Sequence, residues 1–243
     1  MEKTGLSTIL FDLDGTLLPM DQQQVMYAYL KLFRQKCRSI DLDPDRATDA
    51  LMTGLQAMGA HDGSQTNEQV FWSWFSRVMQ IPIDDQVASF IRFYTEEFTQ
   101  IKAVVDPTPL AAQIVQTVRQ KGYCTVLATT PVFPRAGTLE RMRWADLEPQ
   151  WFELITTYED FSHTKPSLLY YQDILDRLNV SADACLMIGN DVAEDLVVSD
   201  MGMEVFLVTD NLINRQQQGI DDIPQGSLTD LLDFCHRLEA VGP

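Results

Sequence analysis

Basic residues are scarce in this sequence. It contains 18 lysines and arginines against 35 aspartates and glutamates, which gives a formal net charge of −17 over 243 residues. Such a chain repels nucleic acid and anionic membrane surfaces, so we expect neither as a partner. Any anionic substrate would need local compensation from a metal ion, a lysine or backbone N–H groups.

Long apolar runs and paired cysteines are also missing, and we expect no leader segment. No apolar run approaches the length of a membrane span. The four cysteines lie far apart without a C-x-x-C pair, and Cys124 and Cys185 sit inside apolar runs, so we expect buried, reduced thiols. The first residues lack the basic and apolar regions of a signal peptide. We therefore expect a cytoplasmic protein.

What the sequence does contain is an alternation of strand and helix patterns. Apolar, β-rich segments predict buried strands, and apolar residues at helical spacing predict the helices between them. The expected strands are 7–14, 123–130, 152–159, 184–191 and 203–210, and the expected helices are 109–122, 134–147, 166–179, 193–202 and 228–241. This order predicts an α/β fold with a doubly wound, Rossmann-like parallel sheet.

A helical block interrupts this alternation directly after the first strand. Helical patterns cover residues 22–37, 45–58, 66–80 and 84–101, with turn signals between them. We expect residues 20–104 to form an all-helical cap, and residues 1–19 with 105–243 to form the α/β core. The aromatic residues expected in the interior of the cap are Phe71, Trp72, Trp74 and Phe75.

Polar residues gather where the expected strands end. Asp12 and Asp14 follow the first strand, where unpaired buried carboxylates would be costly. Thr129 and Thr130 end the second strand, and the fourth runs into the acidic segment "GNDVAED". Because the carboxyl ends of parallel strands share one edge of the sheet, we expect a ligand site there.

Several of these residues also have ordinary alternative roles. Asp12 could form a turn, and Thr129 could cap a helix. Lys165 could be a solvated surface residue, but it precedes an expected helix start, where the helix dipole disfavours a cation unless it faces an anion. The several acids of "GNDVAED" exceed what capping requires, and they favour a hard cation such as Mg²⁺.

Two carboxylates, a cation site, a lysine and hydroxyl groups at one edge suit phosphoryl transfer. One aspartate can attack phosphorus, while the second protonates the leaving oxygen and then activates water. Mg²⁺ and Lys165 would offset the charges of the nucleophile and the phosphate, which otherwise repel each other.

At this point the sequence resembles the haloacid dehalogenase-like superfamily, in its phosphatase branch. The segments "DLDGT", "VLATT", "TKP" and "IGNDVAED" follow the order of the four motifs of that family. The resemblance implies Asp12 as nucleophile, Asp14 as acid and base, and Thr129 and Lys165 as phosphate ligands. It also implies Mg²⁺ held by Asp12, the Asp14 backbone carbonyl and the fourth motif, beneath a mobile cap.

The sequence departs from the family pattern at two positions. Thr130 stands where asparagine is common, and we expect it to bind phosphate beside Thr129. Asn190 opens the fourth motif where aspartate is common, so either Asn190 or Asp191 could complete the metal site. We expect Asp191, because a carboxylate binds Mg²⁺ better than an amide oxygen does. Asn190 and Asp195 would then lie behind it and orient the ligands.

Our leading hypothesis is a Mg²⁺-dependent phosphatase of small phosphorylated metabolites, acting through an aspartyl phosphate. Asp14 favours this over dehalogenase chemistry, because the dehalogenases of the superfamily lack that second aspartate. One alternative is a phosphomutase, which needs cap groups to retain a phosphorylated intermediate; the cap arginines are Arg34, Arg38, Arg46, Arg77 and Arg92. Another is a binding or regulatory protein without turnover, which the full set of acids disfavours.

Overall fold

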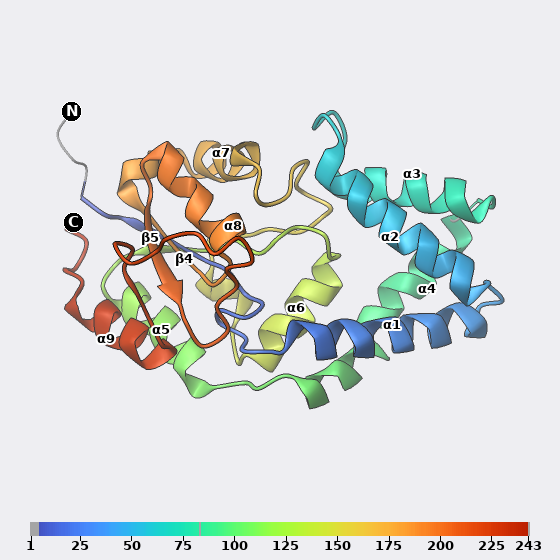
Figure 1. Ribbon diagram of the computed structural model, residues 1–243, viewed down its shortest axis with the longest axis horizontal. Helices are drawn as coiled ribbons and strands as arrows, with labels where there is room; N and C mark the ends of the chain where they lie inside the picture. Colours follow the sequence, from blue (N-terminus) through green and yellow to red (C-terminus); the bar gives the residue numbers. More distant parts are fainter. Residues whose placement is uncertain (1–4, 83, 243) are drawn as a thin grey trace.

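The computed structural model describes residues 5–82 and 84–242, and in these residues it contains a six-stranded parallel sheet (Figure 1). The strands are β1 (Thr8–Phe11), β2 (Cys124–Leu127), β3 (Leu154–Ile155), β4 (Cys185–Gly189), β5 (Glu204–Val208) and β6 (Gln225–Gly226). Their order in space is β3-β2-β1-β4-β5-β6. The chain runs outward from β1 to β3 and then returns to β4, so the order reverses between β1 and β4.

Helices cover both faces of this sheet. The helices of the α/β part are α5 (Pro109–Gln120), α6 (Arg135–Trp144), α7 (Leu168–Leu178), α8 (Val192–Asp195) and α9 (Leu228–Arg237), with short 3₁₀ helices η2 (Pro149–Trp151), η3 (Ala182–Ala184) and η4 (Leu196–Met201). Ile9 and Phe11 of β1 belong to one buried cluster with the apolar residues of α5 and α9, whereas Leu10 belongs to a second cluster with those of α7. The predicted doubly wound, Rossmann-like fold is therefore confirmed.

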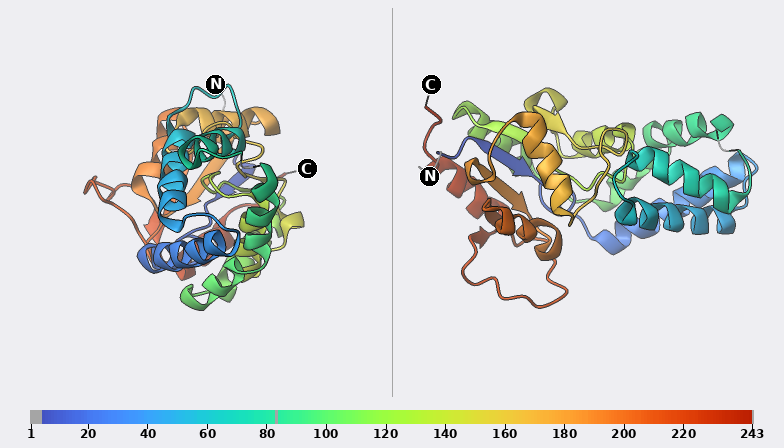
Figure 2. Two further views of the ribbon diagram at one scale, coloured as in Figure 1. Left: turned by 90° about the vertical axis from the view of Figure 1, so that its right-hand side faces the viewer. Right: turned by 90° about the horizontal axis from the view of Figure 1, so that it is seen from above.

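Between β1 and β2 the chain forms a group of helices that lies beside the sheet rather than on it (Figures 1 and 2). We call residues 20–104 the helical block. Its elements are α1 (Gln22–Ser39), α2 (Pro44–Ala60), α3 (Asn67–Met79), α4 (Asp84–Thr95) and the 3₁₀ helix η1 (Phe98–Val104). Asp21 and Asp43 accept hydrogen bonds from the first N–H groups of α1 and α2, and Thr66 forms a capping box with Gln69.

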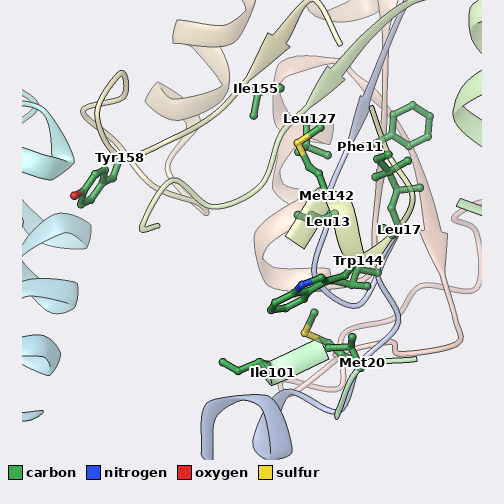
Figure 3. Close-up of a cluster of buried hydrophobic side chains, with 14 of the residues drawn as sticks. Phe11, Leu13, Leu17, Met20, Ile101, Leu127, Met142, Trp144, Ile155 and Tyr158 are labelled. Atoms are coloured by element: carbon green, nitrogen blue, oxygen red, sulfur yellow. The ribbon is translucent and has the colours of Figure 1, made fainter. Parts of the chain in front are cut away.

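The two ends of the helical block leave the sheet side by side. Met20 pairs with Val105 in an antiparallel bridge, and the Asp106 N–H donates a hydrogen bond to the Pro19 carbonyl over 3.0 Å. Met20 belongs to the apolar cluster drawn in Figure 3, in which it lies near Trp144. Trp144 also stacks on Phe98 with 5.0 Å between ring centres, so apolar packing joins the helical block to the α/β part.

Several element boundaries differ from those predicted. The expected strand 152–159 has only the two residues of β3, because its pairing with β2 covers Leu154 and Ile155 and stops where β2 itself ends at Leu127. The expected helix 193–202 is one turn of α8 followed by η4, and the expected helix 84–101 ends at Thr95. β6 was not expected, because a strand of two residues is too short to show an alternation of apolar and polar residues.

Other expectations concern burial. Cys37, Cys185 and Cys235 are buried, Cys124 is partly buried, and all four are free thiols as predicted. Among the residues that the structure describes, we find no helix with the length and apolar character needed to cross a bilayer.

Candidate active site

Asp12 lies where the strand order reverses. It directly follows β1, and Asn190 directly follows the neighbouring strand β4. The Thr16 hydroxyl lies 3.1 Å from Asp12 Oδ2 and 2.9 Å from Asn190 Oδ1. A buried hydroxyl therefore ties the first acidic segment to the last, which is a role for Thr16 that sequence reasoning did not assign.

Two glycines allow these segments to approach each other. Gly15 has a φ of +86°, and a Cβ there would collide with the side-chain amide of Asn190. A Cβ on Gly189 would collide with the carboxylate of Asp195. Both positions need glycine because a polar side chain of the site occupies the space that a methyl group would take.

Lys165 lies between two carboxylates. It comes from the loop between β3 and α7, and its Nζ lies 2.9 Å from Asp12 Oδ1 and 2.7 Å from Asp195 Oδ1. Burial by itself lowers the pKa of Lys165, but Asp12 and Asp195 outweigh it and hold that pKa well above its usual value. Lys165 is therefore a buried ammonium that faces anions, and the surface-lysine interpretation is wrong.

Asp195 holds the backbone that carries the fourth motif. Its Oδ2 accepts hydrogen bonds from the N–H groups of Asn190 and Asp191, each over 3.0 Å, while its Oδ1 accepts from Lys165. Burial raises the pKa of Asp195 to about 6, although the Lys165 ammonium opposes this. Both carboxylate oxygens are thus occupied by protein donors, which suits a residue that positions others.

The side chains of Asn190 and Asp191 do different things. Asn190 is buried, and its Nδ2 donates to the Asn211 carbonyl over 2.7 Å, while its Oδ1 accepts from Thr16. Asp191 is half-buried, and its Oδ1 accepts from the first free N–H groups of α8. Asn190 Oδ1 therefore lies beside Asp12, whereas one oxygen of Asp191 caps a helix; the choice of Asp191 as metal ligand stays a prediction.

The two threonines after β2 reach the same edge. Thr129 is buried, and its carbonyl accepts from the Tyr170 hydroxyl over 3.1 Å. The Thr130 hydroxyl donates to Glu194 Oε2 over 2.9 Å, and burial raises the pKa of Glu194. Both threonines border the same cavity as Asp12, as expected, and their role as phosphate ligands stays a prediction.

Arg141 is a site residue that sequence reasoning missed. Its guanidinium, on α6, forms an ion pair with Asp14 Oδ2 and lies over the Phe133 ring at 4.2 Å from the ring centre. Asp14 Oδ1 is buried and has no hydrogen-bond partner within the described part of the chain. Burial raises the pKa of Asp14, and Arg141 partly opposes this. Nothing in "ERMRW" distinguishes Arg141 from Arg143, which is exposed.

The oxygen donors at this edge fit Mg²⁺. Among the described residues, no three carboxylate, imidazole or thiol groups lie close enough to form a metal centre by themselves. The donors would instead be the Asp12 carboxylate, the Asp14 carbonyl and one side-chain oxygen from Asn190 or Asp191. Such a mixed oxygen set, completed by water and substrate, is what Mg²⁺ prefers.

A cavity of about 760 Å³ opens beside these residues. Asp12 and Asp14 lie at its sheet end, and the helical block supplies most of the remaining wall. Figure 3 shows Tyr158 pointing away from the cluster around Trp144 and toward the helices, and Tyr158 also borders the cavity.

The cap aromatics divide between two environments. Phe71 and Phe75 are buried as expected, and they border the cavity together with the half-buried Trp72. The expectation for Trp74 is wrong: its side chain is 38% exposed, and Arg77 lies over the ring. On the helical pattern, Trp74 falls on the solvent side of α3, where the arginine covers it.

An aspartate segment at the switch point of a parallel sheet is the arrangement that the sequence resemblance predicted. A model of the haloacid dehalogenase-like hydrolases matches residues 6–197. The chain belongs to this family.

Individual relatives are distant but span most of the chain. The pyrophosphatase PpaX of Bacillus cereus (strain Q1) is 22% identical over 185 residues, which are 76% of this chain and 74% of PpaX. The HAD phosphatase structure from Thermococcus onnurineus has a TM-score of 0.59 at 18% identity and covers 97% of this chain and 100% of its own. YfnB from Bacillus subtilis, bound to magnesium and showing interdomain movement, has a TM-score of 0.55 at 20% identity with coverage of 97% and 100%.

Proposed function

We propose that this protein is a Mg²⁺-dependent phosphatase that hydrolyses small phosphate monoesters through an aspartyl phosphate on Asp12. The observation that carries the proposal is the buried contact between Asp12 and Lys165, in which Lys165 Nζ lies 2.9 Å from Asp12 Oδ1. Asp14 lies in the same turn as Asp12. PpaX, a relative at 22% identity, is a pyrophosphatase and so also acts on a phosphoryl group.

In the first step Asp12 is the nucleophile. A carboxylate oxygen forms a bond to phosphorus as the bond from phosphorus to the leaving oxygen breaks, and Asp14 gives its proton to that oxygen. Burial raises the pKa of Asp14, which favours the protonated form that this step needs. Lys165, Thr129 and Thr130 donate hydrogen bonds to the phosphate oxygens and stabilise the charge that develops there.

In the second step a water molecule displaces Asp12 from phosphorus. Asp14, now a carboxylate, takes a proton from a water molecule whose oxygen bonds to phosphorus. The bond from phosphorus to Asp12 breaks, inorganic phosphate leaves, and both aspartates return to their starting states.

Asp12, the Asp14 carbonyl and Asp191 would hold Mg²⁺, with Asn190 and Asp195 orienting them. When bound there, the ion supplies positive charge against the phosphate and the Asp12 carboxylate. The magnesium-bound structure of YfnB supports this choice of metal.

The helical block is proposed to be a cap that closes over the site. Its two connections are adjacent, at Met20 and Val105, so a change in a few backbone torsions there would swing the whole block. The interdomain movement seen in YfnB supports a motion of this kind. Closure would exclude water from the first step.

The phosphomutase alternative has less support. None of the five arginines of the helical block borders the cavity in the described structure. Arg34 pairs with Asp45, and the Nε–H of Arg46 donates to the Val78 carbonyl. The block therefore offers no cation to retain a phosphorylated intermediate, and hydrolysis is favoured.

The test is phosphate release from 4-nitrophenyl phosphate with Mg²⁺ and after removal of divalent ions with EDTA. We expect turnover that depends on Mg²⁺. Turnover unaffected by EDTA would contradict the metal requirement, and no turnover of any phosphate ester would favour the binding alternative.

A further inference from the structure

The part of the cavity wall that comes from the helical block carries no charge. Among the described residues, those of the block that border the cavity are aromatic or aliphatic apart from Gln22 and Gln23, and they include Phe33, Leu51, Phe90 and Phe93. The apolar surface continues outward to Met26 and Tyr27, which border the cavity and are 46% and 73% exposed. Large exposed apolar groups next to a cavity indicate a binding surface for an apolar molecule.

Four of the polar side-chain groups around this wall bond to each other in pairs. The hydroxyl groups of Tyr29 and Tyr94 lie 3.0 Å apart, and the Trp72 Nε1–H donates to the Tyr158 hydroxyl over 3.2 Å. Burial raises the pKa of Tyr94 to about 12, so its hydroxyl stays neutral. With these atoms paired, the rings can present their apolar faces to the cavity, and a polar ligand would lose bonds to water without equivalent replacement.

The charged residues that border the cavity lie outside the block, and most are acidic. They include Asp12, Asp14 and Glu194. The basic residues among them are Arg141, which is paired with Asp14, and Arg215. A leaving group with a second phosphate or a carboxylate would find no cation in the wall of the block.

We propose that the substrate is a phosphate monoester of an uncharged, largely apolar alcohol, whose alkyl or aryl group fills this cavity. This inference rests on the proposed phosphatase function and adds the class of leaving group. The cavity volume of about 760 Å³ is within the range of roughly 300–1,000 Å³ typical of sites that enclose a whole small molecule. The inferred leaving group differs from that of the relative PpaX, which is a pyrophosphatase.

A series of straight-chain alkyl phosphates from ethyl to decyl tests the inference on the wild-type protein. The leaving alcohols have nearly equal basicity, so kcat should vary little while kcat/KM rises by about fourfold for each methylene that enters the cavity. Ethyl phosphate and 2-phosphoglycolate form a matched pair of similar size. We expect the carboxylate of the latter to lower kcat/KM by at least about tenfold, because the described wall of the helical block offers it no cation.

A pair of variants on α2 tests the place of binding. Leu55→Trp fills part of the cavity, because Leu55 borders it, whereas Met52→Trp adds the same side chain at an exposed position that does not. We expect Leu55→Trp to lower kcat/KM for octyl phosphate by about tenfold or more and to change it little for ethyl phosphate. Met52→Trp should change neither.

A binding measurement keeps the inference testable if Leu55→Trp fails to fold. Calorimetric titration of the wild-type protein should give a much lower Kd for octylphosphonate than for methylphosphonate, neither of which can be hydrolysed at its P–C bond.

Hydrolysis of ethyl phosphate or pyrophosphate as fast as octyl phosphate would overturn the inference and leave the phosphatase function standing. Failure to hydrolyse any ester would overturn the proposed function, and equal Kd values for the two phosphonates would then overturn the cavity assignment as well.

Discussion

Asp14 and Arg141 form a contact between two distant parts of the sequence. Arg141 occupies one carboxylate oxygen of Asp14 and leaves the other, Oδ1, buried and unpaired. An unpaired buried oxygen is costly, and a proton shared with the leaving group of a substrate would satisfy it. We therefore expect Arg141 to act as a positioning residue that fixes which oxygen of Asp14 meets the substrate.

Arg141→Met should reduce acid catalysis without abolishing the nucleophilic step. We expect kcat for an alkyl phosphate to fall by about 10²-fold, and kcat for 4-nitrophenyl phosphate, whose leaving group needs no proton, to fall only about threefold. Arg141→Lys, which retains a charge, should restore part of the rate. Equal losses on both substrates would indicate a structural role instead.

The metal ligand can be identified by titration. We expect Asp191→Asn to raise the Mg²⁺ concentration for half-maximal activity strongly and Asn190→Ala to raise it less, because a carboxylate is the stronger ligand. Calorimetric titration of each variant with Mg²⁺ gives the same comparison without turnover. The reverse order would assign the ligand to Asn190, whose Oδ1 accepts from the same Thr16 hydroxyl as Asp12 does.

How much of the site is predictable depends on whether a residue follows a strand. Asp12, Asn190 and the threonines follow strands, and strand ends are recognisable from the apolar runs before them. The position of Lys165 before an expected helix suggested a nearby anion but left the surface-lysine alternative open, and the family resemblance supplied its place in the site. Arg141 and Thr16 were not, since their partners are 127 and 174 residues away and only the fold brings them together.

At the scale of elements, the start of α3 is one place where polar bonds join the helical block to the α/β part. Asn67 is fully buried, its Nδ2 donates to the Pro131 carbonyl over 3.0 Å, and its N–H donates to the Phe161 carbonyl over 2.8 Å. Pro131 directly follows Thr130, so this contact links the block to the segment that we propose binds phosphate.

Asn67→Ala should loosen this contact. We expect it to lower the free energy of unfolding by about 1–3 kcal/mol, because the Pro131 carbonyl loses its buried donor. Urea denaturation measures the change. Asn214→Ala, which removes bonds within an exposed loop, is the control and should cost under about 0.5 kcal/mol. Equal stability of the two variants would contradict the role given to Asn67.

The helices and strands were predicted correctly where the apolar pattern is long. Their ends were predicted incorrectly where packing decides where an element stops. The four long helices of the block and the central strands were predictable from period and turn signals. β3 was predicted too long, because β-branched residues such as Thr156 favour strands. In the structure the Thr156 hydroxyl instead donates a hydrogen bond to the backbone carbonyl of Leu127. The expected helix 193–202 is divided between α8 and the 3₁₀ helix η4, a change of helix type that the apolar period does not reveal.

At the scale of the whole molecule, the α/β part has a buried cluster on the α7 side of the sheet that contains no residue of the helical block. Replacing residues 20–104 by a short linker between Pro19 and Val105 should therefore leave a folded but less stable core. Trp144 would lose its contact with Phe98, so its fluorescence should shift to longer wavelength. The preference for octyl over ethyl phosphate should disappear.

Circular dichroism measures whether the shortened chain folds, and the values of kcat/KM for octyl and ethyl phosphate measure the preference. A shortened chain that stays unfolded would contradict the division into core and cap. A folded core that keeps the full preference for octyl phosphate would contradict the assignment of selectivity to the helical block.

The central claim is that Asp12 carries the phosphoryl group during turnover. The most direct measurement is mass spectrometry of the enzyme quenched in acid during steady-state hydrolysis. We expect a mass increase of one phosphoryl group on the peptide that contains Asp12, and its absence in Asp12→Asn, whose turnover should fall by at least ~10³-fold with folding intact. Normal turnover in Asp12→Asn, or a phosphoryl group on another residue, would contradict the account.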